Sequence, residues 1–156
     1  MAVYSIVKIG DPILREKAKP VKEASPSLNR LLQNMAETMY EAKGVGLAAP
    51  QIGVSKRVIV IDVGEGLLEI INPEVVEATG EETDVEGCLS VPGVIGKVAR
   101  YTYMRVKGRD RNWQAVEITG QGLLARALQH EIDHLEGILF VDKAETLEKT
   151  SENVPG

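Results

Sequence analysis

The segment that most constrains the fold of this chain covers residues 121–136, directly before Gly137. Its apolar side chains recur at helical spacing, and a glycine after such a run commonly ends a helix. One face carries Leu124, Leu128, Ile132 and Leu135, and a second carries Leu123, Ala127, His130 and His134. Since a helix that is apolar around most of its circumference is usually buried, we expect this one to lie at the centre of the domain.

Both histidines of the chain lie on this expected helix, four residues apart, with Glu131 between them. Positions i and i+4 share a helix face, so two imidazoles there can bind one metal ion. The intervening glutamate is then placed to take a proton from water at that ion. The motif therefore predicts a hydrolytic metal site.

Cys88, the only cysteine, is the candidate third ligand. Catalytic sites of the zinc type combine three protein ligands with one open position for water. A thiolate with two imidazoles suits Zn or Fe(II), and the ion lowers the pKa of the bound water toward neutrality. Glu131 would accept the proton of that water and deliver it to a leaving amine. Cys88 alone would more commonly be a small buried apolar residue, so its role depends on lying near the histidines.

Composition bounds the class of protein. The 156 residues are 44% hydrophobic and 26% charged, which suits a single domain with one core. A net charge of −5 argues against a dedicated nucleic-acid binder, which usually carries a basic face. A single cysteine cannot form an intrachain disulfide, the first residues lack a signal-peptide pattern, and no apolar run approaches the length of about 20 residues that spans a bilayer. We expect a cytoplasmic protein without nucleic-acid or membrane binding.

Local patterns predict the other elements. Ser25 followed by Pro26 is typical of a helix start, and apolar spacing extends that helix toward Gly44. Alternating and β-branched runs predict two strand pairs, residues 57–63 with 67–71 and residues 101–107 with 115–118.

Turns and polar stretches complete the organisation. Asn72-Pro73 predicts a turn, and the acidic residues 77–86 predict a strand and loop on the surface. Residues 145–156 are polar and weakly patterned, as in a partly disordered tail. We therefore expect a catalytic domain over residues 1–144 and a polar C-terminal tail over 145–156.

A glycine-rich loop, residues 44–53, follows the first predicted helix. Its glycines superficially resemble a dinucleotide-binding fingerprint, but that fingerprint follows a strand and opens a helix. Here the order is reversed, which excludes the dinucleotide interpretation. The bare backbone of this loop would instead let an extended ligand approach.

Three stretches resemble the signature motifs of the peptide deformylase family, in the same order. They are Gly44-Val-Gly-Leu-Ala-Ala-Pro-Gln-Ile-Gly53, Glu86-Gly-Cys-Leu-Ser90 and Gln129-His-Glu-Ile-Asp-His134. The stretch Gly10-Asp-Pro-Ile-Leu-Arg15 is similar to the opening of that family, and the resemblance extends from Ile6 to Asp142.

The resemblance implies removal of the N-formyl group from the initiator methionine of nascent polypeptides. It implies that Cys88, His130 and His134 bind the metal, with Fe(II) as the physiological ion and Zn, Ni or Co in purified protein. Glu131 would be the general base and then the acid. The side chain of Gln51 and the backbone N–H of Leu89 would stabilise the oxyanion formed when metal-bound hydroxide attacks the formyl carbon.

The residues themselves suggest where the substrate would bind. Ala127 and Leu123 lie one and two turns before His130, and with Val45 they would wall an apolar pocket for a methionine side chain. The main chain of the substrate would pair with the loop at Gly44 and Gly46 by strand addition, which is indifferent to sequence.

The chain departs from the family pattern in two places. Trp113 falls where many members have a glycine in a hairpin turn. The tail lacks the long basic helix with which some members dock on the ribosome. We therefore expect nascent chains as partners and transient proximity to the ribosome, but no docking by that route.

The predicted fold class is α+β, with antiparallel sheets packed around the central helix that carries the His-Glu-x-x-His motif. Two other functions remain open. A peptide-cleaving metalloprotease would need a ligand such as Glu145 or Glu148 in place of Cys88. A metal-stabilised binding module would need a fourth protein ligand, although no further histidine or cysteine exists.

Overall fold

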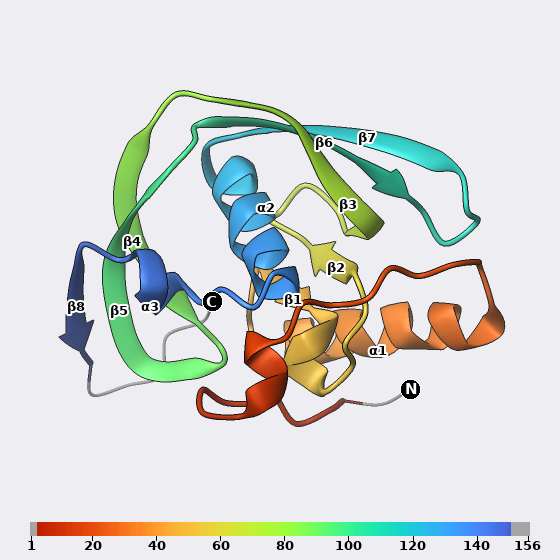
Figure 1. Cartoon of the computed structure of the whole chain (residues 1–156), viewed down its shortest axis with the longest axis horizontal. Helices are drawn as coiled ribbons and strands as arrows, with labels where there is room; N and C mark the ends of the chain where they lie inside the picture. The colour runs from red at the N-terminus through yellow and green to blue at the C-terminus, as the bar shows by residue number, and fades with distance from the viewer. Residues whose placement is uncertain (1–2, 151–156) are drawn as a thin grey trace.

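Helix α2 (Gly122–Leu135) lies between two antiparallel sheets in the computed structural model, which describes residues 3–150 (Figure 1). Its buried apolar side chains include Ala125, Leu128 and Leu135. Gly137 follows the helix with a φ of 77°, a left-handed conformation that commonly ends helices. The prediction of a buried central helix over residues 121–136 is confirmed, as is the α+β fold class.

The larger sheet supplies most of the surface against which α2 packs. Its strands lie in the order β1-β2-β3-β6-β7, and every pair is antiparallel. Side chains such as Ile59, Ile70 and Val106 from this sheet form one core cluster with Leu128. The strands are β1 (Gly46–Ala48), β2 (Val58–Ile61), β3 (Leu68–Thr79), β6 (Tyr103–Arg109) and β7 (Ala115–Gln121).

A second sheet covers the opposite side of α2. It has the order β4-β5-β8, with β4 (Glu82–Cys88), β5 (Val91–Arg100) and β8 (Thr146–Lys149). Its core cluster includes Cys88, Val98 and Phe140. The described part of the chain also has three short helical segments: η1 (Pro12–Arg15), η2 (Ala49–Ile52) and α3 (Phe140–Lys143).

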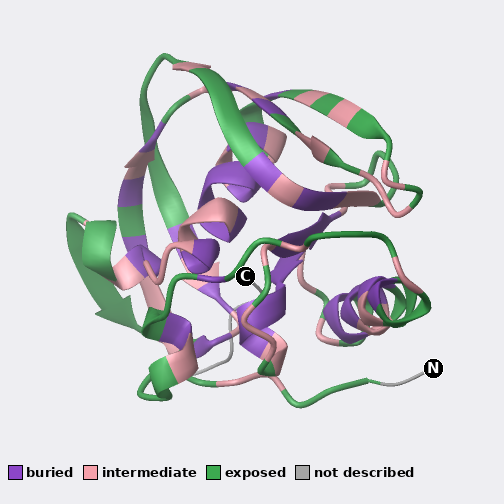
Figure 2. Cartoon of the chain, turned by 45° about the vertical axis from the view of Figure 1, so that its right-hand side comes forward, coloured by how far each residue is buried: buried purple, intermediate pink, exposed green. Residues whose placement is uncertain are grey.

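Helix α1 (Pro26–Glu41) packs outside the larger sheet. Ser25 caps it by accepting a hydrogen bond from the backbone N–H of Leu28. Its buried face packs against β1 and β2, while its other face is exposed to solvent (Figure 2). The predicted start is confirmed, and the helix ends at Glu41, before Gly44.

The predicted turn at Asn72-Pro73 is wrong, because β3 continues through both residues. Asn72 has a φ of 54°, and the pairing of β3 with β6 shifts register between Ile71 and Glu74. The Asn72 side chain also binds both the N–H and the carbonyl of Val21. A β-bulge held by a distant segment thus produces the features that locally indicate a turn.

Two further features were not predicted from the sequence. The polar segment after residue 144 contributes β8, which pairs with β5 from Val94 to Lys97, while residues 151–156 lie outside the described part of the chain.

Trp113 has a φ of 65°, in the left-handed region that favours glycine. Its ring lies 5.8 Å from the guanidinium carbon of Arg109, a cation–π contact that accompanies the unusual backbone.

Candidate metal centre

Cys88, His130 and His134 lie together although Cys88 is distant from the histidines in sequence. One potential ligand atom from each falls within 4.8 Å of the others. The sulfur of Cys88 is 3.4 Å from Nε2 of His134, and all three residues are buried. The arrangement arises because α2 presents both histidines on one face and Cys88 ends the adjacent strand β4.

The chemistry of these groups fits a divalent metal ion. Buried polar atoms normally have a hydrogen-bond partner, so unpaired ones indicate a missing ligand. Four buried side-chain atoms in the described part of the chain have none, and two of them, Nε2 of His130 and Oε1 of Glu131, lie at this centre. Nδ1 of His134 is also unpaired, while Nε2 of the same ring faces Cys88. A thiolate with two imidazoles matches the ligand preferences of Zn or Fe(II).

Glu131 lies beside the three candidate ligands, with its carboxyl group buried. Burial raises the pKa of Glu131 to about 7. A group with such a pKa can accept and return a proton near neutral pH. Its Oε2 lies against Gly46, where an added Cβ would be only 2.6 Å away. Gly46 is therefore needed for the close approach of this carboxylate.

The Gln51 side chain is held from both ends. Its Oε1 accepts a hydrogen bond of 3.0 Å from the backbone N–H of Ala48. Its Nε2 donates to Oγ of Ser90 at 3.1 Å and lies 3.7 Å from the sulfur of Cys88. The amide nitrogen thus lies against Cys88 of the ligand cluster. Sequence reasoning gave no role to Ser90, although it lies only two residues after Cys88.

Leu89 follows Cys88 at the turn between β4 and β5, where Cys88 pairs with Val91. Its side chain packs over Gly44, so that a Cβ there would be 2.8 Å from Cδ1 of Leu89. Gly44 and Gly46 therefore make room for parts of the protein itself. From the sequence alone, we expected their bare backbone to let an extended ligand approach.

A pocket of about 120 Å³ opens beside the ligands. The predicted wall residues Val45, Leu123 and Ala127 line it together with His130 and Glu131. Strand β4 forms the facing wall, and Arg126 completes the lining. The pocket is small and mainly apolar, and the candidate catalytic carboxyl group lies in its wall.

Glu86 was expected on the surface, but it is buried behind the metal centre. Its carboxylate accepts hydrogen bonds from Arg100, Arg126 and Nδ1 of His130, the last at 3.0 Å. Burial opposes the charged form of Glu86, but the hydrogen bonds from Arg100 and His130 outweigh it, and its pKa lies well below the usual range. With Nδ1 of His130 donating to Glu86, Nε2 is left to bind a metal.

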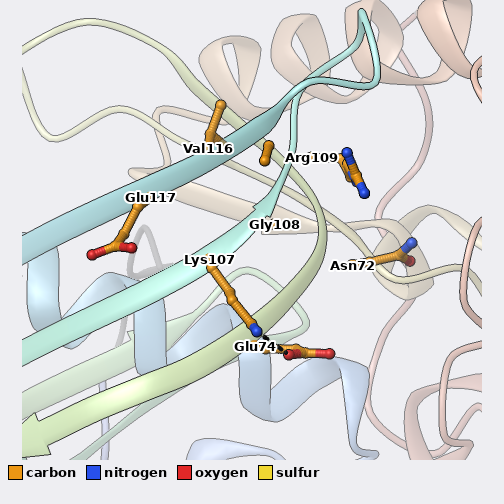
Figure 3. A pocket seen from close by; sticks show the side chains of 8 residues that line it. Asn72, Glu74, Lys107, Gly108, Arg109, Val116 and Glu117 are labelled. Atoms are coloured by element: carbon orange, nitrogen blue, oxygen red, sulfur yellow. Dashed lines mark ion pairs between the residues drawn. The ribbon is translucent and has the colours of Figure 1, made fainter.

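A larger hollow of about 640 Å³ lies elsewhere, beside the middle of β3, the end of β6 and the start of β7 (Figure 3). Its side chains include Glu74 and Lys107, which form an ion pair, and Arg109. In Figure 3 the Lys107 and Glu74 side chains point toward each other, whereas Arg109 points away from this pair. None of its lining residues belongs to the ligand cluster or the adjacent pocket, so size does not identify the functional site here.

The alternative ligands suggested by the sequence do not join the cluster. Within residues 3–150, the one group of cysteine, histidine and acidic side chains arranged to hold a metal is Cys88, His130 and His134. Glu148 lies on β8 and lines a separate hollow.

No helix within residues 3–150 has the length and apolar character to cross a membrane.

Comparison with known proteins agrees with this geometry. The family model described as polypeptide deformylase matches residues 3–150. A peptide deformylase from Carboxydothermus hydrogenoformans is 65% identical over 147 residues, covering 94% of this chain and 97% of that protein. The crystal structure of a peptide deformylase from Legionella pneumophila is 50% identical, with a TM-score of 0.90 over 92% of this chain and 87% of the other. That of the enzyme from Thermotoga maritima is 42% identical, with a TM-score of 0.91 over 94% of this chain and all of the other.

Proposed function

The chain belongs to the polypeptide deformylase family and is a deformylating hydrolase, and from this premise we propose that its substrates are nascent polypeptides that begin with N-formylmethionine. Hydrolysis of the formyl amide would release formate and leave a free methionine amine. The observation that carries the proposal is the buried Glu131 carboxyl group beside Cys88, His130 and His134, all at one small apolar pocket.

The residues of the cluster would hold one divalent metal ion, Fe(II) physiologically and Zn, Ni or Co in purified protein. Such an ion, when bound, supplies Lewis acidity and lowers the pKa of water toward neutrality. Burial lowers the pKa of His134 and so favours the neutral imidazole that binds metals. Cys88 would contribute a thiolate, whose charge favours ions that accept soft ligands.

Glu131 would move the proton in both halves of the reaction. With a pKa raised to about 7, its carboxylate accepts a proton from the attacking water and returns it to the departing methionine nitrogen. Because a negative charge develops on the formyl oxygen, donors that are already fixed in place stabilise it. The Nε2–H group of Gln51 and the backbone N–H of Leu89 would be those donors.

The methionine side chain would enter the pocket lined by Val45, Leu123 and Ala127. The main chain of the substrate would pair with the backbone near Gly44 and Gly46, so that recognition beyond the first residue would not depend on sequence. The partners would be nascent chains, and the location cytoplasmic with transient proximity to the ribosome. Every residue given a role here lies in the proposed catalytic unit, residues 1–144.

Replacement of Glu131 by Gln tests the mechanism. The substitution keeps the size of the side chain but removes the titrating group, so we expect full metal content and a loss of deformylation of formyl-Met-Ala-Ser of about 100-fold or more. Cys88→Ala is the companion variant, which should lose metal affinity. Full activity in metal-loaded Glu131→Gln would overturn the proton-transfer role, and unchanged metal affinity in Cys88→Ala would overturn the ligand set.

A further inference from the structure

Arg126 connects the helix in the pocket wall to both neighbouring strands of the smaller sheet. It lies on α2, one turn before His130, and only 11% of its side chain is exposed. Its Nη1 donates to Oε2 of Glu86 at 2.6 Å and to the carbonyl of Val98 at 2.9 Å. Its Nη2 donates to the carbonyl of Glu82 at 2.8 Å. All three acceptors belong to β4 or β5, so one guanidinium connects the helix to two strands of the smaller sheet.

The two walls of the pocket come from these same elements. Leu123, Ala127 and Glu131 belong to α2, whereas Val85 and Gly87 belong to β4. Strand β4 is at the edge of its sheet, so it pairs with β5 on one side only. An edge strand keeps its distance from a neighbouring helix mainly through side-chain contacts. The bonds of Arg126 to Glu82 and Glu86 provide such contacts, together with the bond from His130 to Glu86.

Arg100 and Arg126 both bind Glu86, but their other hydrogen-bond partners differ. Arg100 binds both carboxylate oxygens, at 2.8 and 2.9 Å, and also binds Asp133 at 2.6 Å. Such a bidentate pair holds Glu86, and through it the ring of His130, without help from Arg126. The bonds that Arg126 alone provides are those to the main chain of β4 and β5. Its loss should therefore alter the pocket more than the orientation of His130.

We propose that Arg126 is a positioning residue that determines specificity, because it sets the distance between β4 and α2 and thus the width of the pocket that receives the first side chain of the substrate. The inference rests on the proposed function, which gives that pocket its occupant. A well-fitted apolar pocket distinguishes side chains that differ by one methylene by about 10-fold to 200-fold, and it loses this discrimination when its walls can separate.

The test is the kinetics of Arg126→Met and Arg126→Lys with formyl-Met-Ala-Ser and formyl-Phe-Ala-Ser. Methionine keeps the apolar stem but removes all hydrogen-bond donors. Lysine keeps the charge but can make only some of the three hydrogen bonds of Arg126. We expect Arg126→Met to raise KM for the methionine peptide about tenfold, with kcat within about threefold, because ground-state binding is lost rather than proton transfer. The preference for methionine over phenylalanine should fall about fivefold or more, with Arg126→Lys in between.

Arg105→Met is the matched control. Arg105 also pairs with two carboxylates, Glu77 and Glu117, but it lies on β6, away from the pocket. This variant loses the same charge and should keep the KM and the preference of the wild type. A general loss of stability would not change the ratio between two substrates, so the ratio separates positioning from a purely structural role.

A binding measurement makes the inference independent of activity. Calorimetric titration of each metal-loaded protein with Met-Ala-Ser and Phe-Ala-Ser, which carry no formyl group, should show the same loss of preference in Arg126→Met. An unchanged preference in both assays would overturn the role of Arg126, as would a fall in kcat alone. If Arg126→Met does not fold, Arg126→Lys is judged by the same ratio. If the wild type binds Met-Ala-Ser selectively but does not deformylate formyl-Met-Ala-Ser, the proposed function is refuted. The role of Arg126 in the width of the pocket is then decided by the binding measurement.

Discussion

At the scale of single residues, the centre depends on one glycine that makes room for a carboxylate. Gly46 lies so close to Glu131 that a Cβ would be 2.6 Å from Oε2 and 3.0 Å from Cδ. Glu131 is buried and cannot easily move aside. The residue type at position 46 therefore controls where the proposed proton carrier sits.

Gly46→Ala should accordingly lower kcat. A displacement of the catalytic group by about 1 Å can cost about 100-fold in rate. Gly44→Ala is the matched control, since the one close contact of its Cβ would be with the terminal Cδ1 of the Leu89 side chain, at 2.8 Å. We expect a clearly smaller loss there, measured as kcat on formyl-Met-Ala-Ser at equal metal content. Equal losses in the two variants would mean that the Glu131 contact is not what matters.

Ser90 is a second residue whose role follows from a contact. Its buried hydroxyl accepts a hydrogen bond from Nε2 of Gln51, the proposed oxyanion donor. Removing one such donor typically costs about 100-fold to 1000-fold in kcat, so Gln51→Ala should fall in that range. Ser90→Ala should lose about tenfold, because Gln51 remains but is less well oriented. If both act on one transition-state charge, the double variant will lose less than the product of the single losses, and strictly multiplicative losses would contradict the coupling.

At the scale of elements, the start of α1 offers a test of stability that leaves the centre untouched. Ser25 caps the helix through the N–H of Leu28, at 3.1 Å, whereas the neighbouring Ser27 hydroxyl is exposed and contacts Ser25. Ser25→Ala should lower the free energy of unfolding by about 1 kcal/mol, measured by urea denaturation. Ser27→Ala should cost less than half as much, and kcat should stay unchanged in both. Equal costs would show that the cap does not stabilise the helix.

The turns η1 and α3 are joined by an ion pair between Arg15 and Asp142. The hydrogen bond from Arg15 lowers the pKa of Asp142, so the folded protein binds this proton less readily than the unfolded chain. The pair therefore stabilises the fold fully above the ordinary carboxyl pKa of about 4, and this contribution is lost as the pH falls through the lower folded value. Asp142→Asn should cost about 0.5–1 kcal/mol at pH 7, since both side chains are partly exposed. The difference from the wild type should shrink below pH 4 in unfolding experiments, and a constant difference would exclude the ion pair as its cause.

The elements also show what could be predicted from sequence. The helices α1 and α2 follow from caps and apolar spacing, because those signals act within the element itself. The bulge at Asn72 and the strand β8 depend on partners elsewhere in the chain, Val21 and β5 respectively. Glu86 was placed on the surface because its neighbours are acidic, but Arg100, Arg126 and His130 come together around it only in the folded chain. The candidate metal ligands could be named because so few cysteines and histidines exist, whereas Ser90 and Arg126 are identified by their contacts.

At the scale of the whole molecule, the metal centre is where the two halves of the structure meet. Cys88 ends a strand of the smaller sheet, whereas His130 and His134 belong to the helix that packs on the larger one. A metal held by all three would connect the two sheets through α2. An ion that binds only the folded form stabilises it in proportion to the logarithm of its concentration over its Kd.

Removal of the metal should therefore lower the thermal midpoint as well as the activity. At a free ion concentration about 100 times the Kd, the stabilisation is about 2.7 kcal/mol, which for a chain of this size corresponds to about 5–10 °C. Dialysis against a chelator followed by calorimetry should show this fall, and readdition of Fe(II) under anaerobic conditions should reverse it. Cys88→Ala is the control, since the metal-free and metal-treated forms of this variant should melt at nearly the same temperature. Elemental analysis must first show that the chelated wild type has lost its metal. If its thermal midpoint is nevertheless unchanged, the ion acts in catalysis without connecting the two sheets.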